Sequence, residues 1–589
     1  MLEQAPECIE VCFQVIAKLI ELIKNKSVSV VYLIDILFCF HDPHLFQEKS
    51  MIKLKNPSGL ILFSIFIGWL ANMLFYDKRP GISLIIFVAI FSTGFWMLSQ
   101  LENRPLKKGN LWLLGPLFFC AVMVMIRANE VLIALNILTT IFCFVLLAIF
   151  MTTGKAHSLG LLGFGTLPFR AAGNMLLKPW PIVRDNLSVN TESIQLSARD
   201  TIYPVLRGVI FAIPVLLVFL GLLVSADAVF AQTILRLFDI DINFGILRFF
   251  WTVFVILAFG WAAAGYSAYA LRTPASVAKP IPERILEKIR GRLPLGTIES
   301  LTILALIDLL FGTFVIIQFA YLFGGNQFID LGDTSYAEYA RRGFFELVAV
   351  AVLTLLLIQV MNWFTVKKHA RDKLLFNLFS SLIIGFVIVM LISAFQRLAL
   401  YEWTYGFTQL RIFVHTFVVW MGVALVWYVI TLWRRPDRFA IGALLCLFGF
   451  VVTLNLLNPD AMIVRKNLQR YQTIGHLDLE YLTKLSADAV PDLILLAAEI
   501  ETDFTLDNGI DNGIDNGNEC SGHDWARVSS GSENSVDYST RSTCIETSHP
   551  DLLTDNLISR ANEYKHDPSW AAWQSFHIAH SRAALQLAN

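Results

Sequence analysis

Residues 131–151 read VLIALNILTTIFCFVLLAIFM, a run of 21 residues without one charged side chain. A helix of about 20 mostly apolar residues is long enough to cross the hydrocarbon layer of a membrane. The composition of the whole chain agrees, since 56% of the residues are hydrophobic and 16% are charged. Soluble domains have about a quarter charged residues. The stretch therefore predicts a transmembrane helix.

The same pattern recurs along the chain. Eleven stretches reach or nearly reach the required length: 58–75, 81–100, 111–126, 131–151, 202–224, 247–270, 298–323, 344–364, 374–396, 407–432 and 439–457. Residues 28–40 are also apolar but short and interrupted by Asp35, so they fit an amphipathic extension better than a twelfth span. The sequence predicts an all-α polytopic membrane helix bundle of about 11 transmembrane helices over 58–457.

Lysine and arginine collect on one side of the expected spans. Residues 41–57, just before the first span, and every second loop after it hold 24 basic residues, whereas the intervening loops hold seven. Cytoplasmic loops of membrane proteins are enriched in these residues. We therefore expect the N-terminus in the cytoplasm and, with an odd number of spans, the C-terminus outside. The acidic start MLEQAPECIEVCF is unlike a cleaved signal peptide, so the first span is expected to direct insertion.

Two parts of the chain are expected outside the membrane. Residues 1–57 are predicted to be a cytoplasmic amphipathic extension. From residue 458 the chain becomes polar, and 458–589 is predicted to be a small soluble domain with helical pairs at 476–500 and 551–588. Between those pairs the repeat DNGIDNGIDNGNE is a series of turn dipeptides. It predicts a flexible insert over 501–549.

Two cysteines, Cys520 and Cys544, flank the polar part of this insert. A C-terminus outside the cell would lie in an oxidising compartment, which permits a disulfide between them. Two free thiols are the alternative. A zinc set with His523 and His549 is a further one, although the spacing matches no strong zinc motif. We predict no metal site and no cofactor.

Six stretches, in a fixed order, resemble one family of membrane proteins. They are GWLANMLFYDKRPGISLIIF (68–87), LLVSADAVF (222–230), YAEYARRGFFELV (336–348), RLALYEWTYGFTQLRIF (397–413), LNLLNPDAMIVRKNLQRY (454–471) and LDLEYLTKLSADAVPDL (477–493). Over about residues 58–500 the chain resembles the bacterial polytopic family known as domain of unknown function 4173, with its 4153 relatives, and 569–585 resembles the closing segment of that family. The resemblance implies a location in the bacterial plasma (inner) membrane. It implies no chemistry, because the family has no established activity.

Arginine and tyrosine cluster on the side expected to be extracytoplasmic. The set comprises Tyr336, Tyr339, Arg341, Arg342 and Glu346 around the start of the eighth span, and Arg397, Tyr401, Tyr405 and Arg411 around the start of the tenth. Spacings of four residues place several of them on shared helix faces. Arginine binds carboxylate or phosphate through two hydrogen bonds, and tyrosine adds a hydroxyl or a ring. The set predicts either a site for an anionic ligand or ordinary anchoring at the membrane interface, where both types are common.

Two ionisable residues are expected within the membrane. Asp308 lies about ten residues into the seventh span, and His415 lies near the outer third of the tenth. Ionisable residues inside membranes often mark transport or proton pathways. The alternative for Asp308 is a neutral carboxyl that is hydrogen-bonded to a neighbouring helix.

No pattern typical of catalysis is present. The sequence lacks GxSxG, HExxH and a P-loop, and its net charge of −1 gives no support for nucleic-acid binding. The sequence therefore favours a non-enzymatic receptor or scaffold that uses its arginine-tyrosine surface to engage an envelope protein or an anionic small molecule. A transporter of an anionic or lipid-linked solute is the alternative, and a lipid-modifying enzyme is the third candidate.

Overall fold

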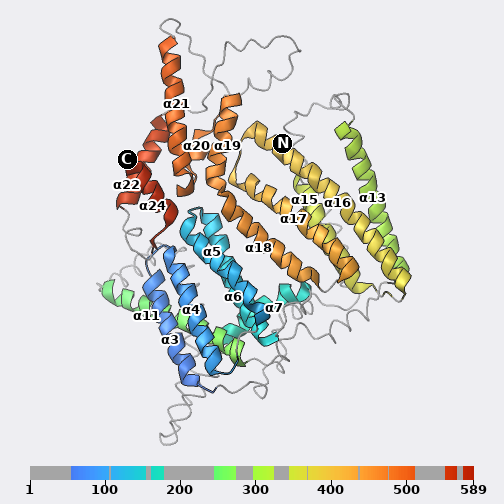
Figure 1. Ribbon diagram of the computed structural model, residues 1–589, viewed down its shortest axis with the longest axis horizontal. Helices are drawn as coiled ribbons and strands as arrows, with labels where there is room; N and C mark the ends of the chain where they lie inside the picture. Colours follow the sequence, from blue (N-terminus) through green and yellow to red (C-terminus); the bar gives the residue numbers. More distant parts are fainter. Residues whose placement is uncertain are drawn as a thin grey trace, which may run out of the picture.

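The computed structural model is a bundle of long apolar helices covered at one end by shorter ones (Figure 1). It describes residues 55–104, 108–153, 161–177, 179, 244–272, 296–323, 344–365, 367, 369–435, 438–474, 477–510, 551–566 and 575–588. In this part of the chain all regular secondary structure is helical, and there is no strand. The predicted all-α helix bundle is confirmed.

Ten helices among the described residues are long and apolar enough to cross a membrane. They are α3 (Pro57–Phe75), α4 (Ile82–Leu101), α5 (Leu114–Ile126, with the 3-10 turn η3 at Lys108–Leu113 before it), α6 (Glu130–Thr153), α11 (Phe244–Arg272), α13 (Thr297–Phe323), α15 (Phe344–Phe364), α16 (Ala370–Tyr405), α17 (Gln409–Arg434) and α18 (Phe439–Leu457). They match ten of the eleven predicted spans. The predicted span at 202–224 lies outside the described residues, as does the N-terminal extension before residue 55.

The spanning helices pack as two groups. In the first, α3, α4, α5, α6, α11 and the amphipathic helix α7 (Leu161–Leu177) share one apolar core. In the second, α13, α15, α16 and α17 share another. Helix α18 contributes Leu444 and Phe448 to the first core and Phe439 to the second. It therefore joins the two groups.

Helices α3 and α11 approach closely because glycines line their contact. A Cβ placed on Gly68 would lie 2.2 Å from the backbone oxygen of Ile256, and one on Gly260 would lie 3.0 Å from that of Ser64. Small residues let transmembrane helices bring their backbones together, which increases the van der Waals contact that holds them. The sequence of this pair is thus fitted to a contact in which a larger side chain has no space.

The C-terminal helices form a cap over one end of the bundle (Figure 1). This C-terminal cap consists of α19 (Pro459–Ile474), α20 (Leu479–Thr483), the 3-10 turn η7 (Ala487–Ala489), α21 (Val490–Ile510), α22 (Asp551–His566) and α24 (Ile578–Ala588). Asn458, with a φ of 50°, bends the chain between α18 and α19. The apolar core of the cap also includes Ala128, from the connection between α5 and α6, and Ile412, from the first turn of α17.

Candidate functional site

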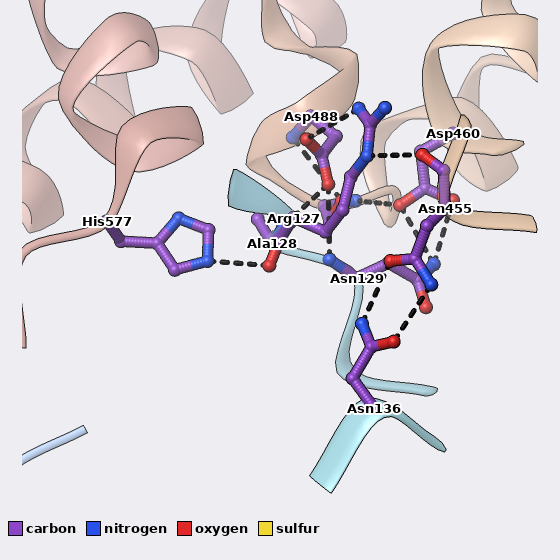
Figure 2. A network of polar contacts seen from close by, with 9 residues as sticks. Arg127, Ala128, Asn129, Asn136, Asn455, Asp460, Asp488 and His577 are labelled. Carbon is purple, nitrogen blue, oxygen red and sulfur yellow. Dashed lines mark hydrogen bonds and ion pairs between the residues drawn. The ribbon is translucent and has the colours of Figure 1, made fainter. Parts of the chain in front are cut away.

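The cap holds the short 127–129 loop between α5 and α6 (Figure 2). Asp488 of η7 accepts hydrogen bonds from the backbone nitrogens of Ala128 at 2.6 Å and Asn129 at 3.3 Å. Its carboxylate also lies 3.7 Å from the Arg127 guanidinium. Burial raises the pKa of Asp488 to about 6, although both backbone donors and Arg127 lower it. This carboxyl therefore fixes the loop through backbone groups that any loop sequence would supply.

A second buried carboxylate, Asp460 at the start of α19, also binds the 127–129 loop. The side chain of Asn129 donates to both its oxygens, at 3.0 and 3.1 Å. Gln409 donates from α17 at 2.7 Å, and the backbone nitrogen of Ser486 donates at 3.1 Å. Asp460 is fully buried, and these donors replace the water it loses. One side chain thus links a loop of the first helix group to a helix of the second.

Two asparagines continue this network down between the spanning helices. Asn136 of α6 and Asn455 of α18 exchange side-chain hydrogen bonds at 2.9 and 2.8 Å, and both are fully buried. Arg127 donates to the backbone oxygen of Asn455 at 2.8 Å. Figure 2 shows the pair directly beside the 127–129 loop. The position of α18 against α6 is therefore set by polar contacts as well as by packing.

The last helix of the cap reaches the same loop from the other side. The His577 ring lies 2.6 Å from the Arg127 carbonyl oxygen, so its Nε2–H donates there. Just before it, the carbonyl of Phe576 accepts from the backbone nitrogen of Ile82 at 3.1 Å. A Cβ on Gly81 would lie 2.5 Å from that same carbonyl. The chain before α24 thus contacts both the α3–α4 and the α5–α6 connections.

Helix α19 of the cap also binds the turn between α16 and α17. Asn467 exchanges hydrogen bonds with the backbone of Phe407, at 2.9 and 3.0 Å. Arg470 donates to the carbonyls of Trp403 and Thr404. Gly406 has a φ of 84°, a conformation that suits glycine because it lacks a Cβ. The cap therefore fixes the point at which the chain reverses beside the predicted arginine-tyrosine surface.

Three of the predicted site residues come together at this reversal. The rings of Tyr401 and Tyr405 lie 4.7 Å apart, centroid to centroid. The Arg411 guanidinium lies 4.4 Å from the centre of the Tyr401 ring and donates to the carbonyl of Gly406. We name Tyr401, Tyr405 and Arg411 the arginine-tyrosine cluster. Tyr405 is 41% exposed, so the cluster can be reached from outside the bundle.

Beneath the cluster lies a pair of a half-buried histidine and a buried glutamate that the sequence did not reveal in full. His415 was predicted as an intramembrane polar residue, and its Nδ1 lies 3.0 Å from a carboxylate oxygen of Glu402. The side chain of Glu402 is 4% exposed. The His415 ring also lies 4.4 Å from that of Phe395. The spacing between Glu402 and His415 matches no motif, because their contact depends on the turn at Gly406.

The other predicted residues have different positions. Glu346 is exposed in the first turn of α15, and Arg397 is half-buried on α16, one turn before Tyr401. Asp308 is buried on α13. Tyr336, Tyr339, Arg341 and Arg342 lie outside the described residues, and so do Cys520 and Cys544. The shared site between Arg342 and Arg397 therefore stays a prediction.

No set of three metal-ligating side chains gathers within the described part of the chain. The buried carboxylates Asp460 and Asp488 are instead occupied by nitrogen donors of the protein itself. The arrangement of the network thus suits structural coupling between the cap and the spanning helices. The arginine-tyrosine cluster, in contrast, presents a cation and two hydroxyl-bearing rings.

Comparison with known proteins identifies one family. The sequence model described as "Domain of unknown function (DUF4153)" matches residues 114–496. The match runs from the start of α5 into α21, so it includes the 127–129 loop, the arginine-tyrosine cluster and the carboxylates of the cap. Neither the curated proteins nor the solved structures contain a match.

Proposed function

We propose that this chain, which belongs to the DUF4153 family, is a multi-pass membrane receptor or scaffold that binds an anionic ligand or partner at its arginine-tyrosine cluster. The observation that carries the proposal is the position of Arg411 over the ring of Tyr401. A guanidinium stacked on a ring keeps its edge available for hydrogen bonds to carboxylate or phosphate.

The charge of Arg411 is available to a ligand. Among the described residues Arg411 forms no ion pair with a carboxylate, and its one hydrogen bond goes to the Gly406 carbonyl. The remaining guanidinium N–H groups suit a planar anion or a phosphate, which accept two such bonds side by side. The rings of Tyr401 and Tyr405 add a surface against which an apolar part of the ligand can pack.

The rigid setting of the cluster supports binding. Helix α16 has 36 residues, so it is about 54 Å long and extends well beyond a hydrocarbon layer of about 30 Å. Tyr401 and Tyr405 lie in its last two turns. Because Asn467 and Arg470 hold the turn that follows, little conformational entropy is lost when a ligand binds.

The orientation belongs to the proposal as well. The excess of lysine and arginine in alternate loops supports a cytoplasmic N-terminus and an extracytoplasmic cap and cluster. The resemblance of the six sequence stretches to the 4173 family supports a bacterial inner membrane. The apolar and polar stretches of the sequence support a division into an extension at 1–57, a membrane domain at 58–457 and a C-terminal domain at 458–589.

The test is ligand-induced stabilisation of the full-length protein in detergent, with inorganic phosphate and succinate as probes. Binding to the folded state at ten times Kd raises its stability by about 1.4 kcal/mol, which a thermal unfolding midpoint resolves. Arg411→Gln should abolish the shift. Arg434→Gln, which removes the same charge from the other end of α17, should retain it. The proposal fails if neither probe shifts the wild type, or if both variants respond alike.

A transporter of an anionic or lipid-linked solute is the second candidate, and the environment of Asp308 favours it. An ionisable group inside the bundle is expensive to keep and usually serves an ion or proton pathway. The receptor and the transporter share the binding cluster, so the probe experiment does not separate them. Uptake of the bound probe into vesicles that contain the protein would distinguish a transporter from a receptor.

A further inference from the structure

Helix α13 has a buried face that includes polar residues. Ser300, Leu304, Asp308 and Val315 are all buried, and Gln318 is half-buried. Their spacings of three, four and seven residues place them on a single stripe. The helix packs mainly against α16, and a Cβ on Gly312 would lie 3.3 Å from the Phe386 ring of that helix. The stripe therefore faces the α13–α16 contact, at the outermost edge of the bundle in Figure 1.

The polar groups of this stripe differ in how they are satisfied. At one end, Ser300 and Thr365 share a hydrogen bond of 2.8 Å, and Thr297 donates to Asp372 at 3.3 Å. Farther along, neither carboxyl oxygen of Asp308 and neither amide atom of Gln318 has a hydrogen-bond partner in the described part of the chain. Asp308 is only 7% exposed. A buried carboxyl without a partner needs an explanation, since such groups are rare in folded proteins.

Asp308 lies too deep in the membrane for bulk water to serve as its hydrogen-bond partner. Asp308 lies eleven positions after Thr297, the start of α13, or about 16 Å along the helix axis. This is about half of a hydrocarbon layer of roughly 30 Å. The packed helices offer no counter-charge, because residues 374–396 of α16 and 347–364 of α15 contain no titratable side chain. A carboxylate anion is costly in such a place, whereas the neutral acid is far less so.

We propose that Asp308 is a proton-binding site within the membrane, at the contact between α13 and α16. The carboxyl holds a proton at rest and loses it only when water reaches the contact. Loss of the proton would place a bare anion between the two helices and would favour their separation. This inference does not depend on ligand binding at the arginine-tyrosine cluster.

The test is reaction with dicyclohexylcarbodiimide, an apolar reagent that adds to protonated carboxyl groups and leaves a stable N-acylurea. The full-length protein in lipid vesicles is treated between pH 6 and 9, and the adduct on each acidic residue is measured by mass spectrometry. Glu346 and Asp372, near the ends of spanning helices, are internal controls. We expect at least about tenfold more adduct on Asp308 than on either, the ratio that 1.4 kcal/mol of difference in protonation free energy gives. The Asp308 adduct should decrease as pH rises.

Three outcomes would overturn the proposal. The first is an Asp308 adduct no more abundant than those on the controls. The second is labelling that does not change with pH. The third is protection of Asp308 by sodium chloride but not by choline chloride at constant pH, because this would identify a metal-cation site. Asp308→Asn should remove the adduct from this peptide alone, and its folding is checked by size-exclusion chromatography. The wild-type comparison decides the matter even if that variant does not fold.

Discussion

Acidification should release α24 from the rest of the cap. His577 is 1% exposed and hydrogen-bonded to the Arg127 carbonyl. The centres of the His577 and His580 rings lie 5.0 Å apart. Burial lowers the pKa of His577 from 6.5 to about 4. Burial, with the neighbouring charges of His577, Arg79 and Arg560, lowers the pKa of His580 to about 3. Both rings therefore dock in the neutral form.

The sign and size of the effect follow from these values. Each pKa is lower in the docked state than the ordinary value of 6.5, so the released state binds more protons as pH falls. Docking is then fully stable above about pH 7 and weakens as pH falls through 6.5. At pH 5 a released histidine is almost fully charged and a docked one is still neutral. The difference is about 2 kcal/mol per histidine, or roughly 30-fold in the docking equilibrium.

Hydrogen–deuterium exchange of the full-length protein measures this release directly. Amides of Ile578–Ala588 should lose protection between pH 7.5 and pH 5, after correction for the intrinsic pH dependence of exchange. The double variant with His577→Gln and His580→Gln keeps an amide donor for the Arg127 carbonyl but cannot be charged. Its protection should stay constant across the same range. Unchanged protection of wild-type α24 at pH 5, or an equal loss in the double variant, would refute the reasoning.

Two further predictions concern the contacts that assemble the fold. Asp488→Ala removes the acceptor of two backbone N–H groups in the 127–129 loop. Each donor left without a partner should lower the free energy of unfolding by about 1–3 kcal/mol, which lowers the thermal unfolding midpoint. Asp488→Asn keeps an acceptor oxygen and should lower the midpoint less. Gly68→Ala should separate α3 from α11, because its methyl group would lie 2.2 Å from the Ile256 oxygen. We expect a cost of about 1–3 kcal/mol in the same assay, and none for Gly385→Ala, whose Cβ meets nothing within 4 Å.

The spanning helices could be predicted because their signal is local. A run of about 20 apolar residues is visible without knowledge of its neighbours. The ends of the helices were harder to place, as α16 shows. The apolar pattern predicts 374–396, but the helix continues to Tyr405. Its last turns contain Arg397, Tyr401, Glu402 and Tyr405, a pattern that predicts a polar loop, although Glu402 packs inward against His415.

Contacts within the site could be predicted only where the residues share a helix. Tyr401 and Tyr405 are four residues apart, and their contact follows from that spacing. The partners of the 127–129 loop could not be found in this way, because Ala128 and Asp488 are 360 residues apart in the chain. No short-range pattern marks such a pair. The one local sign in the sequence is an aspartate in a turn between helices, and a solvated turn would explain it equally well.

The cap connects the two groups of spanning helices through its polar network. Asp488 holds the loop of the first group, whereas Asn467 and Arg470 hold the α16–α17 turn of the second. Asp460 contacts both, through Asn129 and Gln409. A shift of α16 against α6 would therefore break hydrogen bonds to buried groups, each at a cost of about 1–3 kcal/mol. Arg411 lies beside the α16–α17 turn, and Asp308 faces α16 from the other side. Ligand binding at the cluster and proton loss from Asp308 would therefore both act on α16. The cap would either oppose the resulting movement of α16 or pass it on to the first helix group.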